Sequence, residues 1–437
     1  MVCSRSTVRI IVLVGSVFVV TAAAQVPTSQ ERALLQAMLK DAHEAVRMHY
    51  FDRSFNGVDW AGRYAESQTA LAQVTSLPAG LATIAGMLDG LGDSHTVFYP
   101  PGWLREVDYG YDLGAVGDVI MVTAVRESTD AAGKLHPGDV VSSLNGQPVT
   151  RQSLPHTRYV LSALTPLAET RLTVRAGAGA ERTVDVRSTV TESRAMRFLG
   201  GGYRFSDLVR ADQEAEFPHR GQAVSLGPVL VWKLSRFISD LGDINRVADQ
   251  ARMHKAVVLD LRGNPGGYID ALKRLTSVLF ATDVTIGTMV ERRGRSAMTA
   301  SPRRNRTVDG RLIVLIDSES ASSSEILARV VQIEGRGTVI GDVSAGAVRL
   351  AQVIPFAYGL DTQTPYAISV TVADVLMKDG SSLERRGVIP DERRLPSSSD
   401  IAAGHDPVLA HAVTLAGGVL DAEAAGRLFA RKGPRAQ

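Results

Sequence analysis

The sequence predicts an α/β protein of several domains, and three observations predict this class. Strand-like and helical segments alternate between residues 188 and 396, which is typical of a mostly parallel sheet covered by helices. A helical stretch and then a short β-rich stretch precede this region. The 437 residues are 45% hydrophobic and 22% charged, which suits about two to four globular domains and excludes disordered, collagen-like and polytopic membrane chains.

Residues 1–24 are predicted to be an export signal. Arg5 and Arg9 form a basic start, residues 10–20 are apolar, and three alanines before Gln25 supply a cleavage pattern of small residues. The apolar run is short for a spanning helix, which needs about 20 residues. An uncleaved anchor is the alternative. We therefore expect an exported protein, periplasmic or secreted, with no membrane span in its mature form.

The charge and the cysteine content exclude several partners and several kinds of catalytic or metal site. Two of the 48 Lys and Arg residues lie in the signal, so its removal leaves 46 against 46 Asp and Glu in place of a formal charge of +2. A neutral chain is not suited to nucleic acid as a partner. The one cysteine, Cys3, also lies in the signal, which excludes a disulfide framework, a cysteine nucleophile and a multi-cysteine metal site.

Residues 25–102 are predicted to form an N-terminal helical domain. Its first helix is expected from apolar residues spaced by three and four, namely Leu35, Leu39, Ala42 and Val46. A second helix is expected over residues 60–74. A third is expected over residues 81–91, after a break at Pro78, Ala79 and Gly80.

Residues 103–187 are predicted to form a small β domain. Strands are expected at 119–125, 140–144 and 171–174, with an Asn145-Gly146 turn that is typical of a hairpin. The string at 131–149 resembles the signature of PDZ domains, which add an extended peptide to a sheet edge. Another small antiparallel β barrel is the alternative.

Residues 188–400 are predicted to form the core, and 401–437 a helical tail with one helix at 407–416. The core strands are expected at 229–234, 256–261, 312–316, 339–340, 353–356 and 368–375. The core helices are expected at 244–253, 269–280 and 322–333. The basic stretch 292–306 is interpreted as a solvated loop rather than a binding patch, because the mature chain is neutral.

Two turns that follow core strands contain candidate catalytic groups. Gly263, Gly266 and Gly267 follow the strand at 256–261 and would expose backbone N–H groups, which suits an oxyanion. The lysine and spacing of a phosphate loop are missing, and a purely structural turn is the alternative. The second turn holds five serines within residues 318–324. Ser322 with Glu325 fits a capping box, or else supplies a nucleophile at a helix N-terminus.

Two further segments complete the pattern. Ser94 and His95 lie in a Gly-Asp-Ser-His-Thr turn between the helical and β domains, where a lone histidine is usually a surface or core residue. The segment 378–391 carries Glu384 and ends in Gly-Val-Ile-Pro-Asp. Without its neighbours it would be interpreted as a charged loop.

These four segments, in this order and with a PDZ-like insert, resemble the carboxyl-terminal processing peptidases, or tail-specific proteases, and their tricorn-type relatives. The resemblance implies a serine-peptidase core with a crotonase-like βαβ fold, a protein or peptide substrate, and no metal or organic cofactor. It implies that Ser322 is the nucleophile. It also implies an oxyanion hole from the N–H groups of Ser323 and Gly266, with Gly267 as the alternative.

One departure bears on the mechanism. In the processing branch of this family a lysine follows the nucleophile by 25 residues, but Ala347 stands there. Arg349 cannot replace the lysine as a base because a guanidinium does not lose its proton. The tricorn-like branch uses a Ser-His pair and a glutamate instead.

Ser94, His95 and Glu384 match that tricorn-like pattern. The resemblance therefore implies that His95 takes the Ser322 proton as general base, that Ser94 orients the imidazole, and that Glu384 completes the relay. General-base assistance of this kind contributes roughly 10²–10⁴-fold to a rate.

The sequence thus predicts an exported serine endopeptidase that works through an acyl-enzyme on Ser322. Two alternatives stay open. One is a PDZ-containing peptide-binding protein on a catalytically silent core, suggested by Ala347, and the other is a serine hydrolase of non-peptide acyl substrates. The sequence also leaves homo-oligomer formation open.

Overall fold

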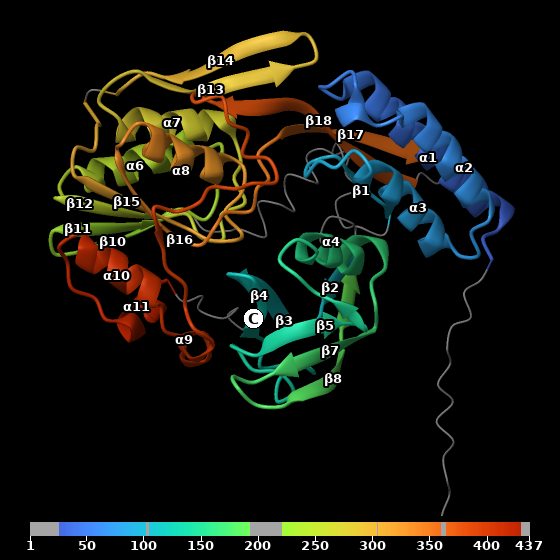
Figure 1. Cartoon of the computed structure of the whole chain (residues 1–437), viewed down its shortest axis with the longest axis horizontal. Helices are drawn as coiled ribbons and strands as arrows, with labels where there is room; N and C mark the ends of the chain where they lie inside the picture. The colour runs from blue at the N-terminus through green and yellow to red at the C-terminus, as the bar shows by residue number, and fades with distance from the viewer. Residues whose placement is uncertain (1–25, 102–104, 193–220, 304, 360–363, 430–437) are drawn as a thin grey trace, which may run out of the picture.

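The computed structural model describes residues 26–101, 105–192, 221–303, 305–359 and 364–429. The predicted signal at residues 1–24, with Cys3, lies outside the described residues. Within these ranges the chain mixes helices with four sheets and so has the predicted α/β class. The long strands of one sheet run from the core toward the N-terminal helices (Figure 1).

Three helices form the N-terminal domain: α1 (Ser29–His49), α2 (Trp60–Ala72) and α3 (Leu77–Asp89). The predicted apolar face of α1 is buried, from Leu35 to Val46. Helix α3 begins four residues before the predicted start, so the break expected at Pro78, Ala79 and Gly80 is wrong. Proline fits the first turn of a helix because its missing N–H has no intrahelical partner there.

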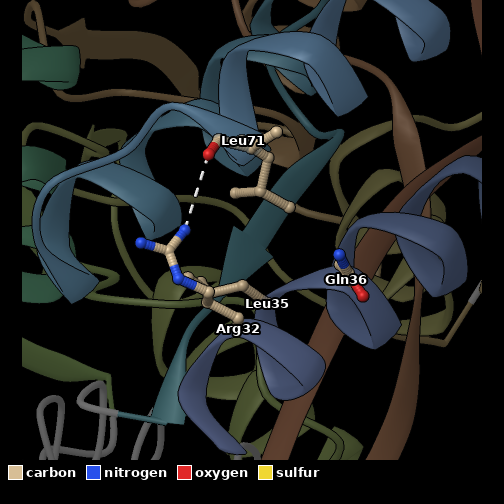
Figure 2. A pocket seen from close by; sticks show the side chains of 5 residues that line it. Arg32, Leu35, Gln36 and Leu71 are labelled. Atoms are coloured by element: carbon tan, nitrogen blue, oxygen red, sulfur yellow. Dashed lines mark hydrogen bonds between the residues drawn. The ribbon is translucent and has the colours of Figure 1, made fainter. Parts of the chain in front are cut away.

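A recess lies between α1 and α2 (Figure 2). Its floor is apolar, from Leu35 and Leu71, and its rim carries Arg32 and Gln36. The Arg32 guanidinium spans it, since Nη1 donates to the Ala72 carbonyl at 3.5 Å. None of the residues that line this recess belongs to the four segments singled out above.

The second unit is a separate antiparallel sheet in the order β3-β4-β5-β7-β8, with β6 beside β5. Its strands are β3 (Tyr111–Val116), β4 (Val119–Val125), β5 (Val140–Leu144), β6 (Gln147–Pro148), β7 (Glu169–Arg175) and β8 (Glu181–Arg187). The predicted hairpin is confirmed, because Asn145 (φ 51°) and Gly146 (φ 77°) join β5 to β6. Helix α4 (Leu154–Tyr159) follows β6. The PDZ-like assignment stays a prediction.

The core sheet has the order β10-β11-β12-β15-β16-β19 and is parallel except for β10. Its strands are β10 (Gln222–Leu226), β11 (Val229–Lys233), β12 (Ala256–Asp260), β15 (Arg311–Ile316), β16 (Gly337–Gly341) and β19 (Glu392–Arg393). Every residue of β12 is buried, as expected for a parallel strand covered on both faces.

Helices cover both faces of this sheet. Three of them pack on one face with alternate strand residues such as Trp232 and Leu259: α6 (Leu241–Ala251), α7 (Ile269–Leu279) and α8 (Ser323–Ile333). The other face packs Val231 and Val258 against α10 (Pro407–Leu415) and α11 (Ala422–Leu428). The expectation of one helix in the tail is wrong, since α11 follows α10 and α9 (Ser398–Ala403) precedes it.

A second sheet of the core packs against the N-terminal helices through residues such as Ile368 and Val370. Its strands are β1 (Val97–Tyr99), β13 (Val284–Glu291), β14 (Gly294–Ala300), β17 (Leu350–Tyr358) and β18 (Thr364–Met377). Strand β1 pairs with β18, so the turn that precedes β1 is held against the core. This turn carries Ser94 and His95.

The basic stretch 292–306 is a loop only in part, which corrects the expectation. Strand β14 occupies residues 294–300 and pairs with β13 as a hairpin. Met298 and Ala300 of β14 are buried while the residues between and before them are exposed. Residues 294–297 are all exposed, so the first half of β14 shows no alternation of apolar and polar residues from which a strand could be predicted. Across the described ranges, no helix has the length and apolar character to cross a membrane.

Candidate active site

Ser94, His95 and Glu384 are joined by hydrogen bonds, although 290 positions separate Ser94 from Glu384. The Ser94 hydroxyl lies 2.6 Å from His95 Nδ1 and donates to Glu384 Oε2 at 3.1 Å. The Ser94 N–H donates to the other oxygen of the same carboxylate at 2.9 Å. The structure therefore brings these three predicted residues together.

Asp93 fixes the backbone of the turn that carries this pair. Its side chain is fully buried and accepts hydrogen bonds from the His95 and Thr96 N–H groups at 2.9 and 2.8 Å. The Thr371 hydroxyl of β18 donates to it at 2.7 Å. Burial alone would raise the pKa of Asp93, but these hydrogen bonds and one from Tyr50 outweigh burial and lower it.

Ser322 lies between β15 and α8 in an unusual backbone conformation, with φ 55° and ψ −118°. A non-glycine residue with positive φ costs about 1–3 kcal/mol and persists only where its surroundings hold it. Two hydrogen bonds hold it, since its N–H donates to the Ala347 carbonyl at 2.8 Å and to Glu325 Oε2 at 3.0 Å. A strained strand-to-helix turn of this kind exposes a nucleophile in other hydrolases.

Gly266 packs directly against the nucleophile turn. A Cβ placed on it would lie 2.7 Å from the Ser322 Cβ and 2.9 Å from the Ser323 nitrogen, and its φ is 93°. Only glycine tolerates both conditions. This close approach puts the glycine-rich turn beside the first N–H of α8.

The N–H groups in this corner are not equivalent. The Gly266 N–H donates to Asn264 Oδ1 at 2.8 Å. Among the described residues, the N–H groups of Gly267 and Ser323 have no hydrogen-bond partner. The Gly266 carbonyl accepts from the Phe237 N–H at 2.9 Å. In a trans peptide the following N–H, that of Gly267, points the opposite way from that carbonyl.

Glu325 is a buried carboxyl at the base of the nucleophile turn. Besides the Ser322 N–H it accepts hydrogen bonds from the Ser344 hydroxyl at 2.6 Å and from the Gly346 and Ala347 N–H groups at 2.7 and 2.9 Å. Burial raises the pKa of Glu325 to about 7, against these hydrogen bonds, which lower it. Glu325 thus fastens the segment 344–347 to the start of α8.

One peptide group connects the two halves of the site. The Ala347 carbonyl accepts from the Ser322 N–H, and the N–H of the same peptide, on Val348, donates to Glu384 Oε2 at 3.0 Å. Within the described residues, no hydrogen bond joins the Ser322 hydroxyl to His95. Catalytic hydrogen bonds of this type often tighten only with substrate.

His95 is surrounded by two carboxylates and one cation. Burial lowers the pKa of His95, Glu384 and Asp93 raise it, and Arg349 lowers it, and the net direction is downward. This lowering of the His95 pKa favours the neutral imidazole. A neutral imidazole has one nitrogen lone pair available for a proton.

A mostly buried ion cluster lies behind the glycine-rich turn. The Arg262 guanidinium contacts both oxygens of Asp260 and both oxygens of Asp406 at 2.7–2.9 Å. Lys233 Nζ lies 3.3 Å from Asp260 and donates to the Arg262 carbonyl. Asp406 begins helix α10, so this cluster ties the C-terminal helices to the turn.

Sequence reasoning missed Asp93 and assigned Glu325 only a capping role. Asp93 stands next to Ser94, and an acidic residue beside a Ser-His pair is a usable signal. The network around Glu325 depends on the segment 344–347, whose contact with α8 the sequence does not show. In the part of the chain that the structure describes, no group of His, Cys, Asp and Glu side chains is arranged to hold a metal ion.

The sequence is similar to those of known processing peptidases. Residues 232–394 match the family model of peptidase family S41. The chain is 22% identical over 387 residues to carboxyl-terminal-processing peptidase 3 of Arabidopsis thaliana, covering 85% of this chain and 71% of that protein. It is 23% identical over 322 residues to the carboxy-terminal processing protease CtpB of Bacillus subtilis, covering 70% and 61%.

The fold is likewise similar to a solved structure. The crystal structure of mature CPAF superposes with a TM-score of 0.62 at 13% identity, covering 85% of this chain and 94% of that chain. At this identity the similarity concerns the fold alone. The fold of this chain is therefore similar to that of mature CPAF over 85% of its length.

Proposed function

We propose that the chain is a serine-type peptidase acting on protein substrates, and that it is an endopeptidase forming an acyl-enzyme on Ser322. The match of residues 232–394 to peptidase family S41 supports the first part. The observation that carries this proposal is the hydrogen-bonded set of Ser94, His95 and Glu384, held on the same peptide group as Ser322.

In the proposed mechanism His95 is the general base. The Glu384 carboxylate only accepts hydrogen bonds, so the Ser94 hydroxyl donates a hydrogen bond to Glu384 and accepts one from Nδ1–H of His95. Nε2 then carries the lone pair. It takes the Ser322 proton as the oxygen attacks the substrate carbonyl, and it later returns that proton to the leaving amine.

The tetrahedral oxyanion is stabilised by the N–H groups of Ser323 and of the glycine-rich turn. Between the two glycines, the proposal favours Gly267 in this conformation, because the Gly266 N–H is occupied by Asn264. Each such donor contributes about 10²–10³-fold to the rate. Water, with His95 as base, then hydrolyses the acyl-enzyme and regenerates Ser322.

A fluorophosphonate probe, which reacts with activated serines, tests the nucleophile. We expect the full chain to be labelled and to cleave a fluorescent casein, and Ser322→Ala to do neither. Ser318→Ala, on the same turn, removes a hydroxyl that donates to the Ala115 carbonyl at 2.6 Å and should keep both activities. Labelling of Ser322→Ala at the rate of the parent would overturn the assignment.

The proposal includes export of the mature chain. It is supported by the basic start, short apolar run and three alanines that precede Gln25. Mass spectrometry of the protein recovered outside the cytoplasm should find Gln25 as the first residue. An intact Met1 on exported, membrane-held protein would instead support the uncleaved anchor.

A further inference from the structure

Arg349 lies buried beside the catalytic turn and is not used in the mechanism above. Its side chain is 10% exposed, and its guanidinium carbon lies 5.0 Å from the centre of the Phe51 ring. Nη1 donates to the Tyr50 hydroxyl at 3.2 Å and lies 3.7 Å from Asp93 Oδ2. Among the described residues, Asp93 is the one carboxylate within ion-pair distance of Arg349.

Asp93 needs this cation. It is a fully buried carboxylate, and a buried charge is retained only when it is paired and hydrogen-bonded. Its hydrogen bonds to the His95 and Thr96 N–H groups define the course of the turn. A change at Arg349 therefore reaches the His95 turn through Asp93, and in the described part of the chain no hydrogen bond joins Arg349 to the imidazole.

The charges around His95 come from each element that packs against it. Glu384 and Asp93 are negative, and Arg349 is positive. The Arg385 guanidinium packs on Gly92 at the outer side of the turn, about 3.1 Å from where a Gly92 Cβ would lie, and it is exposed. Without Arg349 the imidazole would be left with two anions and a screened surface cation.

We propose that Arg349 is a positioning residue of this site: through the buried Asp93 carboxylate it holds the Ser94–His95 turn and offsets the negative charge behind the imidazole. This inference rests on the proposed function of His95. Arg349 never loses its proton, so it supplies fixed charge and geometry rather than proton transfer. The segment with Ala347, where related peptidases carry a lysine base, thus still delivers a cation to the site.

The first experiment measures kcat/KM against pH. In Arg349→Gln the acid limb should move upward, by up to about one pH unit, because the positive guanidinium disfavours the protonated, like-charged imidazole and its removal relieves that repulsion. Arg349→Lys should restore part of the shift, since it keeps a cation. Arg292→Gln is the matched control: its guanidinium donates to the Tyr50 carbonyl at 2.8 Å and does not contact Asp93.

An acid limb that stays in place in Arg349→Gln, or that moves equally in Arg292→Gln, would overturn the proposal. Thermal unfolding of each variant, measured over the same pH range, separates a shifted limb from loss of fold. The double variant Asp93→Asn with Arg349→Gln should return the limb toward the parent, because it removes both charges.

A second readout does not depend on turnover. Histidine labelled at Cε1 is titrated by NMR in the Ser322→Ala background, and His95→Gln identifies the His95 signal among the nine histidines. The His95 midpoint should rise in Arg349→Gln, and an unchanged midpoint contradicts the inference. If the midpoint rises but His95→Gln leaves peptidase activity intact, the proposed function of His95 fails while the role of Arg349 toward the turn stands.

Discussion

Ser322 and Glu384 hydrogen-bond to opposite ends of one peptide group. The Ser322 N–H donates to the Ala347 carbonyl at 2.8 Å, and the Glu384 carboxylate accepts from the Val348 N–H at 3.0 Å. The positions of the proposed nucleophile and of the proposed relay carboxylate are therefore coupled by a rigid unit. Ala347 therefore contributes its backbone carbonyl to this link, while its methyl side chain has no catalytic group.

Glu384→Gln tests the relay. The amide keeps the size of the side chain, but it replaces one acceptor with an NH₂ group where Ser94 and Val348 both donate. We expect kcat to fall by about 10²-fold with a smaller change in KM, since general-base catalysis contributes roughly 10²–10⁴-fold. The measurement is steady-state cleavage of a fluorescent peptide.

The control for this substitution is Glu319→Gln, which removes an exposed ion pair with Arg158 and should change kcat less than about twofold. A Glu384→Gln protein with the activity of the parent would contradict the relay. Unfolding temperatures of both variants show whether a loss of activity reflects loss of structure.

The pH dependence of the parent follows from His95. A base works when deprotonated, and burial with Arg349 holds the pKa of His95 below its ordinary value. The acid limb of kcat/KM should thus have its midpoint below about 6.5, the usual histidine value. Activity measured from pH 4.5 to 8 on a neutral peptide checks this. A midpoint above that value in a protein that is folded throughout would contradict it.

The parts of the fold that the sequence predicted are those with a local cause. Buried strands such as β12 are continuous apolar runs, and the Asn145-Gly146 hairpin needs only two residues with positive φ. Hairpin β13–β14 was not predicted because the first four residues of β14 are exposed and give no alternating pattern. The start of α3 was misplaced because Pro78 was interpreted as a break rather than as a first-turn residue.

In the candidate site too, the features with a local cause could be predicted from the sequence and the others could not. The turns that carry Ser322 and His95 are visible as motifs, but their meeting with Glu384 could be predicted only from the family resemblance. The orientation of the N–H groups of Gly266 and Gly267 depends on Asn264 and on the distant Phe237. Peptide orientations fixed by such long-range contacts leave no pattern in the sequence.

Gly266→Ala should inactivate the enzyme. The added methyl group would lie 2.7 Å from the Ser322 Cβ and 2.9 Å from the Ser323 nitrogen, so it displaces the nucleophile and one oxyanion donor. We expect kcat/KM to fall by at least about 10²-fold. Gly263→Ala is the control, because it has a similar positive φ of 66° but nothing within 4 Å of its Cβ.

Gly263→Ala should lose about 1 kcal/mol of unfolding free energy from backbone strain, and Gly266→Ala should lose more, because its methyl group also clashes with the Ser322 turn; urea denaturation measures both. The contrast lies in activity, which Gly263→Ala should largely keep. Equal activity losses in the two variants would show that strain in the turn, and not the contact with Ser322, controls the rate.

Asp406→Asn tests whether the tail supports the glycine-rich turn. Asparagine is also a good N-cap, so α10 keeps its cap to the Leu409 N–H and the substitution removes mainly the charge opposite Arg262. Both side chains are about one-fifth exposed, which reduces the expected loss of unfolding free energy to about 1–2 kcal/mol, below that of a fully buried pair.

The control is Glu423→Gln, which breaks the exposed pair with Arg427 and should cost less than about 0.5 kcal/mol of unfolding free energy. Urea denaturation compares the two variants, and fluorophosphonate labelling shows whether the turn moves: Asp406→Asn should be labelled more slowly than Glu423→Gln, whereas equal stability and equal labelling would mean that the ion cluster does not position the turn.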